Sequence, residues 1–184
     1  MRTTTKRKMT GDAYRHHRKK WLYIKRFLRR IEQMIMIGFK DFSEQLSETQ
    51  RFNQTMKANR EILGGVSPKF YILYSNVFVS IGALPAPLNP FVRYISPRIV
   101  EVKWENADIE PTGKKMIYVF KYNATRKLPA IYVVEADEPV QMMDIRFPEE
   151  EYGDEVHFWL TFVWPDKKKR TNSAYIGQIL PLSN

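Results

Sequence analysis

The residue types that most often perform acid–base or metal chemistry are sparse in this sequence. Its three histidines are His16, His17 and His157, and the first two are neighbours whose side chains would point about 100° apart on a helix. Such a set does not converge on one ion. The chain contains no cysteine, which excludes disulfides, thiolate nucleophiles and cysteine-based zinc sites. We therefore expect neither a metal site nor a cofactor.

The run of carboxylates at residues 149–151 is the next candidate for chemistry, and it lies in a stretch typical of a turn. A glycoside hydrolase needs two carboxylates at a fixed separation on a rigid scaffold, which a run in a solvated turn does not supply. The sequence also lacks a Gly-x-Ser-x-Gly nucleophile elbow and a glycine-rich phosphate loop. These absences predict a protein that is not an enzyme and has no small-molecule substrate.

Cationic side chains are the chemistry that the sequence does concentrate. The chain has a net charge of +10, and residues 1–30 hold 12 lysines and arginines against Asp12 alone. The rest of the chain holds 18 basic against 19 acidic residues and is close to neutral. A localised basic segment is typical of proteins that bind nucleic acid, an anionic membrane surface or an acidic protein, although it also occurs as a solubilising terminus. The candidate polyanion-binding residues are Arg2, Lys6, Arg7, Lys8, Arg15, Arg18, Lys19, Lys20, Lys25, Arg26, Arg29 and Arg30.

A second candidate contact lies in a charged tip expected at residues 165–172, where Lys167, Lys168, Lys169 and Arg170 follow one another. The alternative is that this tip is only solvated. Tyr14 and Trp21 stand among the N-terminal cations, and interleaved aromatic and cationic side chains can stack on bases. For Trp21, an anchor in the core is an equally good interpretation.

A helix is predicted to carry these cations. Apolar residues recur in steps of three and four over residues 21–42, which indicates one apolar stripe on a helix. The stripe consists of Trp21, Ile24, Phe27, Leu28, Ile31, Met34, Ile35, Phe39 and Phe42. The lysines and arginines end near Arg30–Glu32, so the first half of this helix belongs with the cationic segment and the second half with a packed body. A basic amphipathic helix can also lie on a membrane, but the long stripe favours packing within the chain.

A second helix is predicted from the capping box formed by Ser47 and Gln50, with Gly64-Gly65 at its end. Whether residues 21–62 form one bent helix or two stays open. Downstream of Pro68, short segments rich in β-branched and aromatic residues alternate with polar turns, as strands do. In residues 156–164 both alternating sets are apolar, which predicts a central strand. The predicted strands are 69–74, 77–81, 99–104, 116–122, 130–135, 140–147, 155–164 and 173–180.

These elements predict an α+β fold, in which a long N-terminal helix and a second helix pack on an antiparallel immunoglobulin-like β-sandwich. The expected divisions are a basic flexible arm at 1–20, a helical region at 21–65 and the sandwich at 66–184. No run approaches the roughly 18 apolar residues of a membrane span. No apolar signal-peptide core with a small-residue cleavage site follows the basic start. We expect a cytoplasmic or particle-associated protein.

Two loop motifs carry a family resemblance. Residues 79–90 contain a Ser-x-Gly-x-Leu-Pro pattern, and residues 172–177 read Asn-Ser-x-Tyr-x-Gly. The matching positions are Ser80, Gly82, Leu84, Pro85, Asn172, Ser173, Tyr175 and Gly177. Over about residues 24–182 the chain resembles an uncharacterised bacterial family, the domain of unknown function 6266. These residues imply structural loops and no activity. The N-terminal arm departs from the resemblance, because a Lys/Arg segment stands where the family has a Gly-, Trp- and Arg-rich one.

The sequence supports two functional hypotheses. The first is a non-catalytic binding protein whose basic arm docks on a polyanion, with nucleic acid or an acidic protein as its partner. The alternative is a structural or assembly subunit of a phage-like particle or surface assembly, in which the arm binds a neighbouring subunit and the protein self-assembles.

Overall fold

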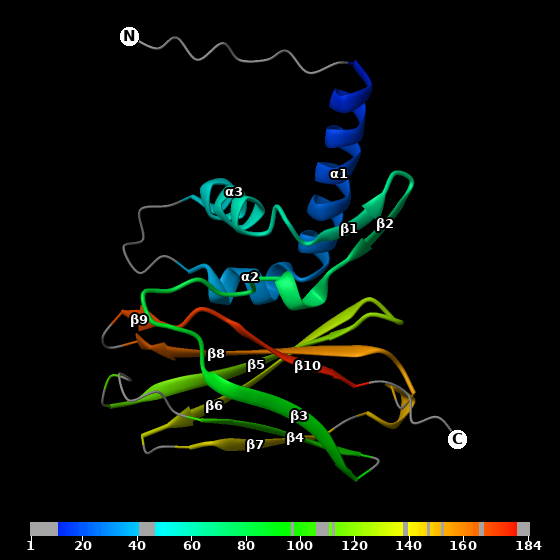
Figure 1. The fold of residues 1–184 in the computed structure, drawn as a ribbon. Coiled ribbons are helices and arrows are strands. Elements are labelled where there is room, and N and C mark those ends of the chain that lie inside the picture. Colours follow the sequence, from blue (N-terminus) through cyan, green and yellow to red (C-terminus); the bar gives the residue numbers. More distant parts are fainter. Residues whose placement is uncertain are drawn as a thin grey trace.

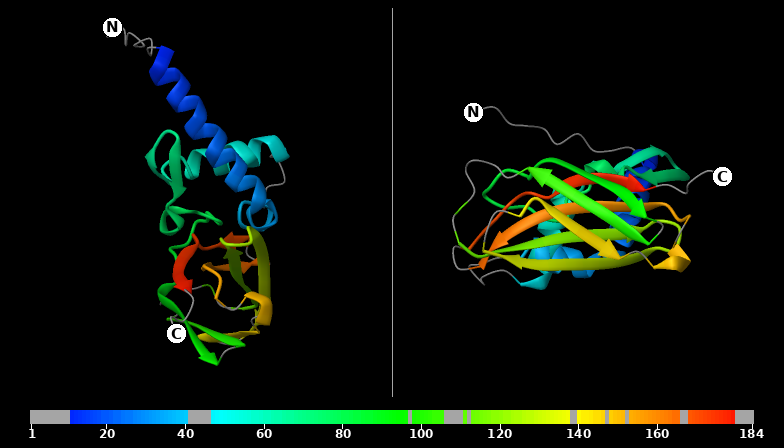
Figure 2. Two further views of the ribbon diagram at one scale, coloured as in Figure 1. Left: turned by 90° about the vertical axis from the view of Figure 1, so that its right-hand side faces the viewer. Right: turned by 90° about the horizontal axis from the view of Figure 1, so that it is seen from below.

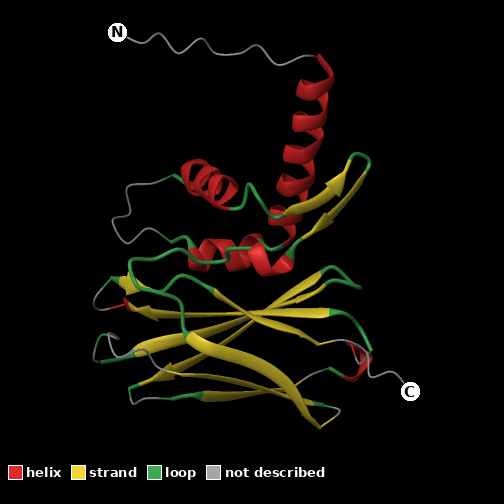
Figure 3. Cartoon of the chain, in the orientation of Figure 1, coloured by secondary structure: helices red, strands yellow, loops and turns green. Residues whose placement is uncertain are grey.

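The computed structural model describes residues 11–40, 47–96, 98–105, 111, 113–137, 140–146, 148–151, 153–165 and 168–179. Within these residues the α-helices are α1 (Gly11–Arg30), α2 (Glu32–Gly38) and α3 (Glu48–Ala58), and η1 (Tyr74–Asn76) and η2 (Glu149–Glu151) are short 3-10 helices. The α-helices gather at one end of the molecule and most strands at the other (Figures 1 and 3). The strands are β1 (Leu63–Val66), β2 (Lys69–Ile72), β3 (Leu88–Ser96), β4 (Ile99–Glu105), β5 (Lys115–Asn123), β6 (Leu128–Ala136), β7 (Met142–Arg146), β8 (Val156–Trp164), β9 (Lys169–Arg170) and β10 (Ala174–Ile179).

Strands β3 to β10 form a sandwich of two antiparallel sheets (Figure 2). One sheet has three strands in the order β3-β4-β7, and the other has five. Four of these five strands follow one another in the order β10-β8-β5-β6, and we call them the four-stranded sheet; the short fifth strand, β9, pairs with β8. The connections β4–β5, β6–β7 and β7–β8 each cross from one sheet to the other, as in the Greek-key topology of immunoglobulin-like sandwiches. The predicted α+β fold is confirmed.

Strand β8 is central, as its two apolar faces predict. It lies between β5 and β10, and all 9 of its residues are buried. Phe158 and Phe162 belong to the core between the two sheets, whereas Trp159 belongs to a separate core on the opposite face. A sheet with two apolar faces needs cover on both sides. The four-stranded sheet is therefore the middle of three layers.

Helices α1 and α2 form the third layer. Their apolar stripe shares a core with Phe120, Tyr122 and Trp159 of the four-stranded sheet. Each large side chain buried in this way contributes about 1.5–3 kcal/mol. Trp21 is half-buried, and Phe42 lies outside the described residues. The stripe residues in this core are Ile24, Phe27, Leu28, Ile31, Met34, Ile35 and Phe39.

The helix expected over residues 21–42 is interrupted at Ile31. α1 ends at Arg30, α2 begins at Glu32, and Ile31 between them has φ −103° and ψ 22°. The chain changes direction here, so that α2 lies along the sandwich while α1 leaves it steeply (Figure 1). No proline or glycine marks the break, and the Ile31 side chain is fully buried. We attribute the bend to packing against the sheet.

Residues 11–20 belong to α1, although the sequence favoured a flexible arm up to residue 20. The β1–β2 hairpin packs beside this part of the helix, because the ring of Phe70 contacts the rings of His16 and Tyr23 at centroid distances of 5.6 and 5.9 Å. The N-terminal half of α1 stands clear of the sandwich (Figure 2). Residues 1–10 lie outside the described residues.

The predicted capping box at the start of α3 is present. The Gln50 N–H donates to the Ser47 hydroxyl at 3.3 Å, and the Ser47 N–H donates to the Gln50 side chain at 2.8 Å. The helix ends at Ala58, well before the glycines that were expected to stop it. The described part of residues 21–62 therefore contains the end of α1 together with α2 and α3, and the helical region ends earlier than residue 65.

Gly64 and Gly65 lie in β1, where they make room for an aromatic side chain. Gly64 pairs with Tyr71 of β2, and a Cβ atom on Gly64 would lie 2.4 Å from Cζ of the Tyr71 ring. An aromatic ring thus covers the backbone of a glycine in the neighbouring strand. The expected boundary at residue 66 falls inside this hairpin, which packs with α1 outside the two sandwich sheets.

Residues 77–81, predicted as a strand, form no strand. The side-chain amide of Asn59 bonds both the N–H and the C=O of Phe78 at 2.9 Å. The hydroxyl oxygen of Ser173 accepts from the N–H groups of Val79 and Ser80 at 3.1 and 3.3 Å. Side chains thus satisfy backbone groups that would otherwise need a neighbouring strand.

Strand β3 was missed in the sequence, because its segment contains Pro90 and follows a proline-rich stretch. Proline cannot donate to a strand ladder and is tolerated on edge strands. β3 is such an edge, since it pairs with β4 alone in the three-stranded sheet.

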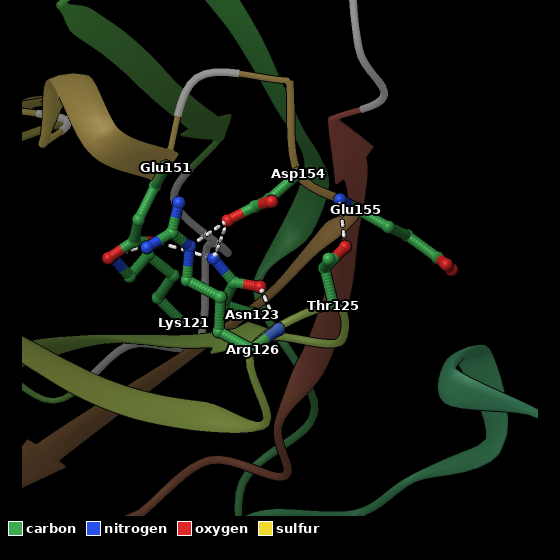
Figure 4. A network of polar contacts seen from close by, with 7 residues as sticks. All are labelled: Lys121, Asn123, Thr125, Arg126, Glu151, Asp154 and Glu155. Carbon is green, nitrogen blue, oxygen red and sulfur yellow. Dashed lines mark hydrogen bonds and ion pairs between the residues drawn. The ribbon is translucent and has the colours of Figure 1, made fainter.

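A buried polar network fixes the turn before β8 (Figure 4). The ammonium group of Lys121, on a side chain 3% exposed, donates to both carboxylate oxygens of Glu151 at 2.8 Å. Asn123 donates to Glu151 at 3.0 Å and to Asp154 at 2.8 Å. Arg126 donates to the same Asp154 carboxylate at 2.5 Å. The carboxylate run at 149–151 is thus not wholly solvated, because Glu151 anchors the turn to β5.

We expect Lys121→Met to lower the free energy of unfolding by about 3–5 kcal/mol, because it leaves the Glu151 carboxylate buried without its cation. Urea denaturation measures this change. The double variant Lys121→Met/Glu151→Leu removes both charges and should recover most of the loss. A single variant within about 1 kcal/mol of the parent would contradict a structural role for the pair.

Candidate nucleic-acid interface

The lysines and arginines of α1 lie on one face of the helix. At about 100° per residue, all except Lys20 fall within an arc of about 140°, opposite the buried Ile24, Phe27 and Leu28. These side chains are all exposed, and from Arg15 to Arg30 they extend along about 22 Å of the helix. We call this set the cationic stripe. It consists of Arg15, Arg18, Lys19, Lys25, Arg26, Arg29 and Arg30.

Ion pairs occupy only the ends of the cationic stripe. Arg15 donates to Asp12 at 2.5 Å, and Arg29 pairs with Glu32. The guanidinium of Arg29 also lies 4.3 Å from the ring centroid of Phe52 on α3. Exposed pairs of this kind contribute about 0–1 kcal/mol and exchange readily with other anions. Across the described ranges no ion pair forms at the middle of the stripe, which holds Arg18, Lys19, Lys25 and Arg26.

Only some of the other predicted polyanion contacts fall within the described residues. Arg2, Lys6, Arg7, Lys8 and Lys167 lie outside the described residues.

Lys168 and Lys169 are exposed and line a cleft of about 1040 Å³ between β9, α3 and residues 75–83. Arg170 differs from them, because it is only 4% exposed and donates to the Ile37 carbonyl at 2.9 Å. It therefore ties β9 to α2 and is not the surface contact that the sequence predicted.

A cleft of about 950 Å³ lies at the base of α1, between this helix, the β2–η1 segment and the four-stranded sheet. We call it the tyrosine cleft. Arg26 and Arg30 of the cationic stripe line it, together with Lys127 from the β5–β6 turn. Its tyrosines are Tyr23, Tyr71, Tyr74, Tyr122 and Tyr175.

His157 packs against two of the tyrosines of the cleft, Tyr74 and Tyr175. Its side chain is 2% exposed, and its ring stacks on that of Tyr74 with centroids 3.7 Å apart. Nε2 lies 2.9 Å from the Glu155 carboxylate, and Nδ1 lies 2.9 Å from the Tyr175 hydroxyl. A carboxylate only accepts, so we place the ring proton on Nε2 and let the Tyr175 hydroxyl donate to Nδ1. With both nitrogens bonded, His157 positions its neighbours and does not itself contact a ligand.

Burial sets the protonation of this cleft. Burial lowers the pKa of His157, although the hydrogen bond and charge of Glu155 act in the opposite direction. Burial also raises the pKa of Tyr175 to about 12 and raises that of Tyr74. Burial raises the pKa of Tyr122 as well, against the charge and hydrogen bond of Arg30. Burial therefore keeps the imidazole of His157 and the phenols of Tyr74, Tyr122 and Tyr175 neutral.

Sequence reasoning missed the tyrosine cleft. Its residues come from five separate segments between positions 23 and 178, and each one is ordinary in its own strand or helix. The available signal was the alternation of β8, which puts His157 on the same face as Trp159 and thus toward the helices. Clustered pKa shifts in a concave site are typical of functional sites. Among the described residues, no group of His, Asp or Glu side chains could hold a metal ion.

The two loop motifs that carried the family resemblance meet in space. The Ser80 hydroxyl donates to the Thr171 carbonyl at 3.0 Å, and the Gly82 N–H donates to the Asn172 side chain at 3.1 Å. The two segments approach so closely that a Cβ atom on Gly82 would lie 2.1 Å from the Arg170 carbonyl oxygen. Glycine is therefore required at position 82. The two motifs thus hold their loops together and have a structural role, as the resemblance implied.

A model of the family of unknown function DUF6266 matches residues 3–177 of the sequence. The chain belongs to the DUF6266 family. The match starts closer to the N-terminus than the resemblance did, so the basic segment and α1 are part of the DUF6266 region. No curated protein matches the sequence.

Fibronectin type III domains resemble the sandwich of this DUF6266 protein. The FN3 domain of human collagen XX shares 15% identity, with 54% of this chain and 93% of that chain covered at a TM-score of 0.40. The FN5 domain of Drosophila Lar shares 10% identity, with 55% and 100% covered at a TM-score of 0.38.

We expect the stability of the protein to fall as the pH drops below about 6.5, the ordinary pKa of histidine. The pKa of His157 is lower in the folded protein than in the unfolded chain, so the unfolded chain binds a proton at this histidine first as the pH falls. Stability is therefore lost as the pH falls from the unfolded-state pKa of His157 toward its folded-state pKa. Urea denaturation at about pH 7.5 and about pH 5.5 measures the effect. His157→Gln should flatten this dependence, whereas His17→Gln on exposed α1 should keep it. An unchanged slope in His157→Gln would refute the assignment.

Proposed function

We propose that this DUF6266 protein is a non-catalytic nucleic-acid-binding protein that contacts phosphates through the cationic stripe and the basic residues of positions 2–8. The observation that carries the proposal is the position of the stripe. It lies on the side of α1 opposite the residues that are packed in the core. The charges are thus presented on a helix whose base is fixed by the fold.

The packing of α1 favours nucleic acid over a membrane surface. A helix that binds a bilayer inserts its apolar face among the lipids. In α1 the side chains of Ile24, Phe27 and Leu28 are already buried against the sheet. None of the helices in the described part of the chain has the length and hydropathy to cross a membrane.

The dimensions of the stripe also suit a nucleic acid. Duplex DNA carries one charge per about 1.7 Å of its axis, so a length of duplex equal to the 22 Å stripe, about 15 residues at 1.5 Å each, carries about a dozen phosphates. Acidic proteins seldom offer so dense and regular a row of charge, and we therefore favour nucleic acid over an acidic protein. The alternative of a structural or assembly subunit stays a prediction.

The test substitutes the residues at the N-terminal end of the cationic stripe and compares this variant with a matched control variant. We expect Arg15→Gln/Arg18→Gln/Lys19→Gln to weaken binding of a DNA duplex in a filter assay. The slope of log affinity against log salt should become shallower by about 0.9 for each phosphate that the variant no longer neutralises. These side chains are exposed, so the fold should be kept.

The control Arg98→Gln/Lys114→Gln/Arg146→Gln removes the same charge from exposed positions on the sandwich. It should leave both the affinity and the salt slope close to those of the parent. Equal weakening by the two triple variants would show that only net charge matters, and the proposal for α1 would fail.

A further inference from the structure

The tyrosine cleft adjoins the cationic stripe and is not explained by phosphate binding alone. Arg26 and Arg30 belong to both features, because they lie on the exposed face of α1 and also line the cleft. An anionic chain that follows the stripe toward the body therefore arrives at the cleft. Its volume of about 950 Å³ is within the range of small-molecule sites, about 300–1,000 Å³.

The aromatic side chains at the entrance are held in place and remain accessible. Tyr71 is 57% exposed, and its ring rests over Gly64, which leaves room for it by lacking a side chain. Tyr23 is 37% exposed, and its ring contacts Phe70 edge-on at 5.9 Å. Fixed, accessible rings of this kind are the platforms on which unpaired bases stack.

Charges of both signs line different walls of the cleft. The guanidinium groups of Arg26 and Arg30 come from α1, whereas the Glu155 carboxylate precedes β8 and lies beside His157. A phosphate is attracted to the arginines and repelled by Glu155. A base carries no such charge, and an exocyclic amino group can donate to a carboxylate. This separation of charge suits a nucleotide whose phosphate lies at the arginines and whose base lies toward Glu155.

We propose that the tyrosine cleft binds an unpaired nucleotide, so that the protein prefers single-stranded nucleic acid to duplex. The inference rests on the proposed function, because the stripe supplies the phosphate contacts of the same strand. The base lies among the tyrosine rings, and its phosphate lies at Arg26 and Arg30. A paired base cannot enter, since its edge and both faces are occupied within the duplex.

The test compares a fluorescently labelled single-stranded DNA of about 15 nucleotides with a duplex of the same sequence, by fluorescence anisotropy of the full chain. We expect the parent protein to bind the single strand more tightly at equal salt. Tyr71→Leu and, separately, Tyr23→Leu should weaken single-strand binding about 5- to 150-fold, the range for removing one ring that stacks on a base, and leave duplex binding unchanged. Leucine keeps an apolar cover over Gly64 and Phe70, and thermal denaturation checks that each variant is folded.

The matched control is Phe91→Leu, which changes an aromatic residue 44% exposed on β3, outside the cleft. It should bind both DNAs as the parent does. If the parent shows salt-dependent binding without preference for the single strand, or both tyrosine variants bind it normally, the cleft inference is overturned and the stripe proposal stands. If the parent binds neither DNA, both proposals fail.

Discussion

The apolar outer face of the four-stranded sheet is the constraint on which the N-terminal half of the protein depends. Trp159, Phe120 and Tyr122 are buried on this face, although the sandwich core already uses the other side of the same strands. Leaving such side chains in water would cost about 1.5–3 kcal/mol each. The helical layer removes that cost, and α1 is held where its C-terminal turns meet the sheet. The position of every cation on α1 follows from this contact.

The same helix therefore has two environments. Its last turns are fixed by burial, and its first turns extend past the sandwich with the β1–β2 hairpin alongside (Figure 1). The remainder of the chain is nearly neutral, so the excess charge is concentrated in the segment that ends with α1. The tyrosine cleft lies where the two environments meet, which places aromatic rings and guanidinium groups side by side. Neither feature requires a catalytic group.

Much of the fold could be predicted because it follows from local periodicity. The apolar stripe, the capping box at Ser47 and the doubly apolar strand β8 are each encoded in consecutive residues. Features set by distant contacts could not be predicted in this way. The bend at Ile31 has no local breaker, and residues 77–81 are kept out of a sheet by side chains of Asn59 and Ser173.

The same distinction between local pattern and distant contacts applies to the candidate site. The cationic stripe is visible in the sequence because its residues recur at helical spacing on one element. The tyrosine cleft is not, because it brings α1, β2, β5, β8 and β10 together. For Arg170 the prediction of a surface contact was wrong. A charged run at a turn indicates solvent exposure, yet this guanidinium is buried against the Ile37 carbonyl.

Hydrogen–deuterium exchange of α1, with and without single-stranded DNA at low salt, tests the central claim most directly. In the free protein the account predicts slow exchange at residues 24–30, which are held by the core, and fast exchange at residues 11–19, which are exposed. On addition of DNA, protection should rise at residues 11–19 and around the tyrosine cleft, with no change in the sandwich core. Unchanged exchange along α1, or new protection confined to the sandwich, would contradict the account.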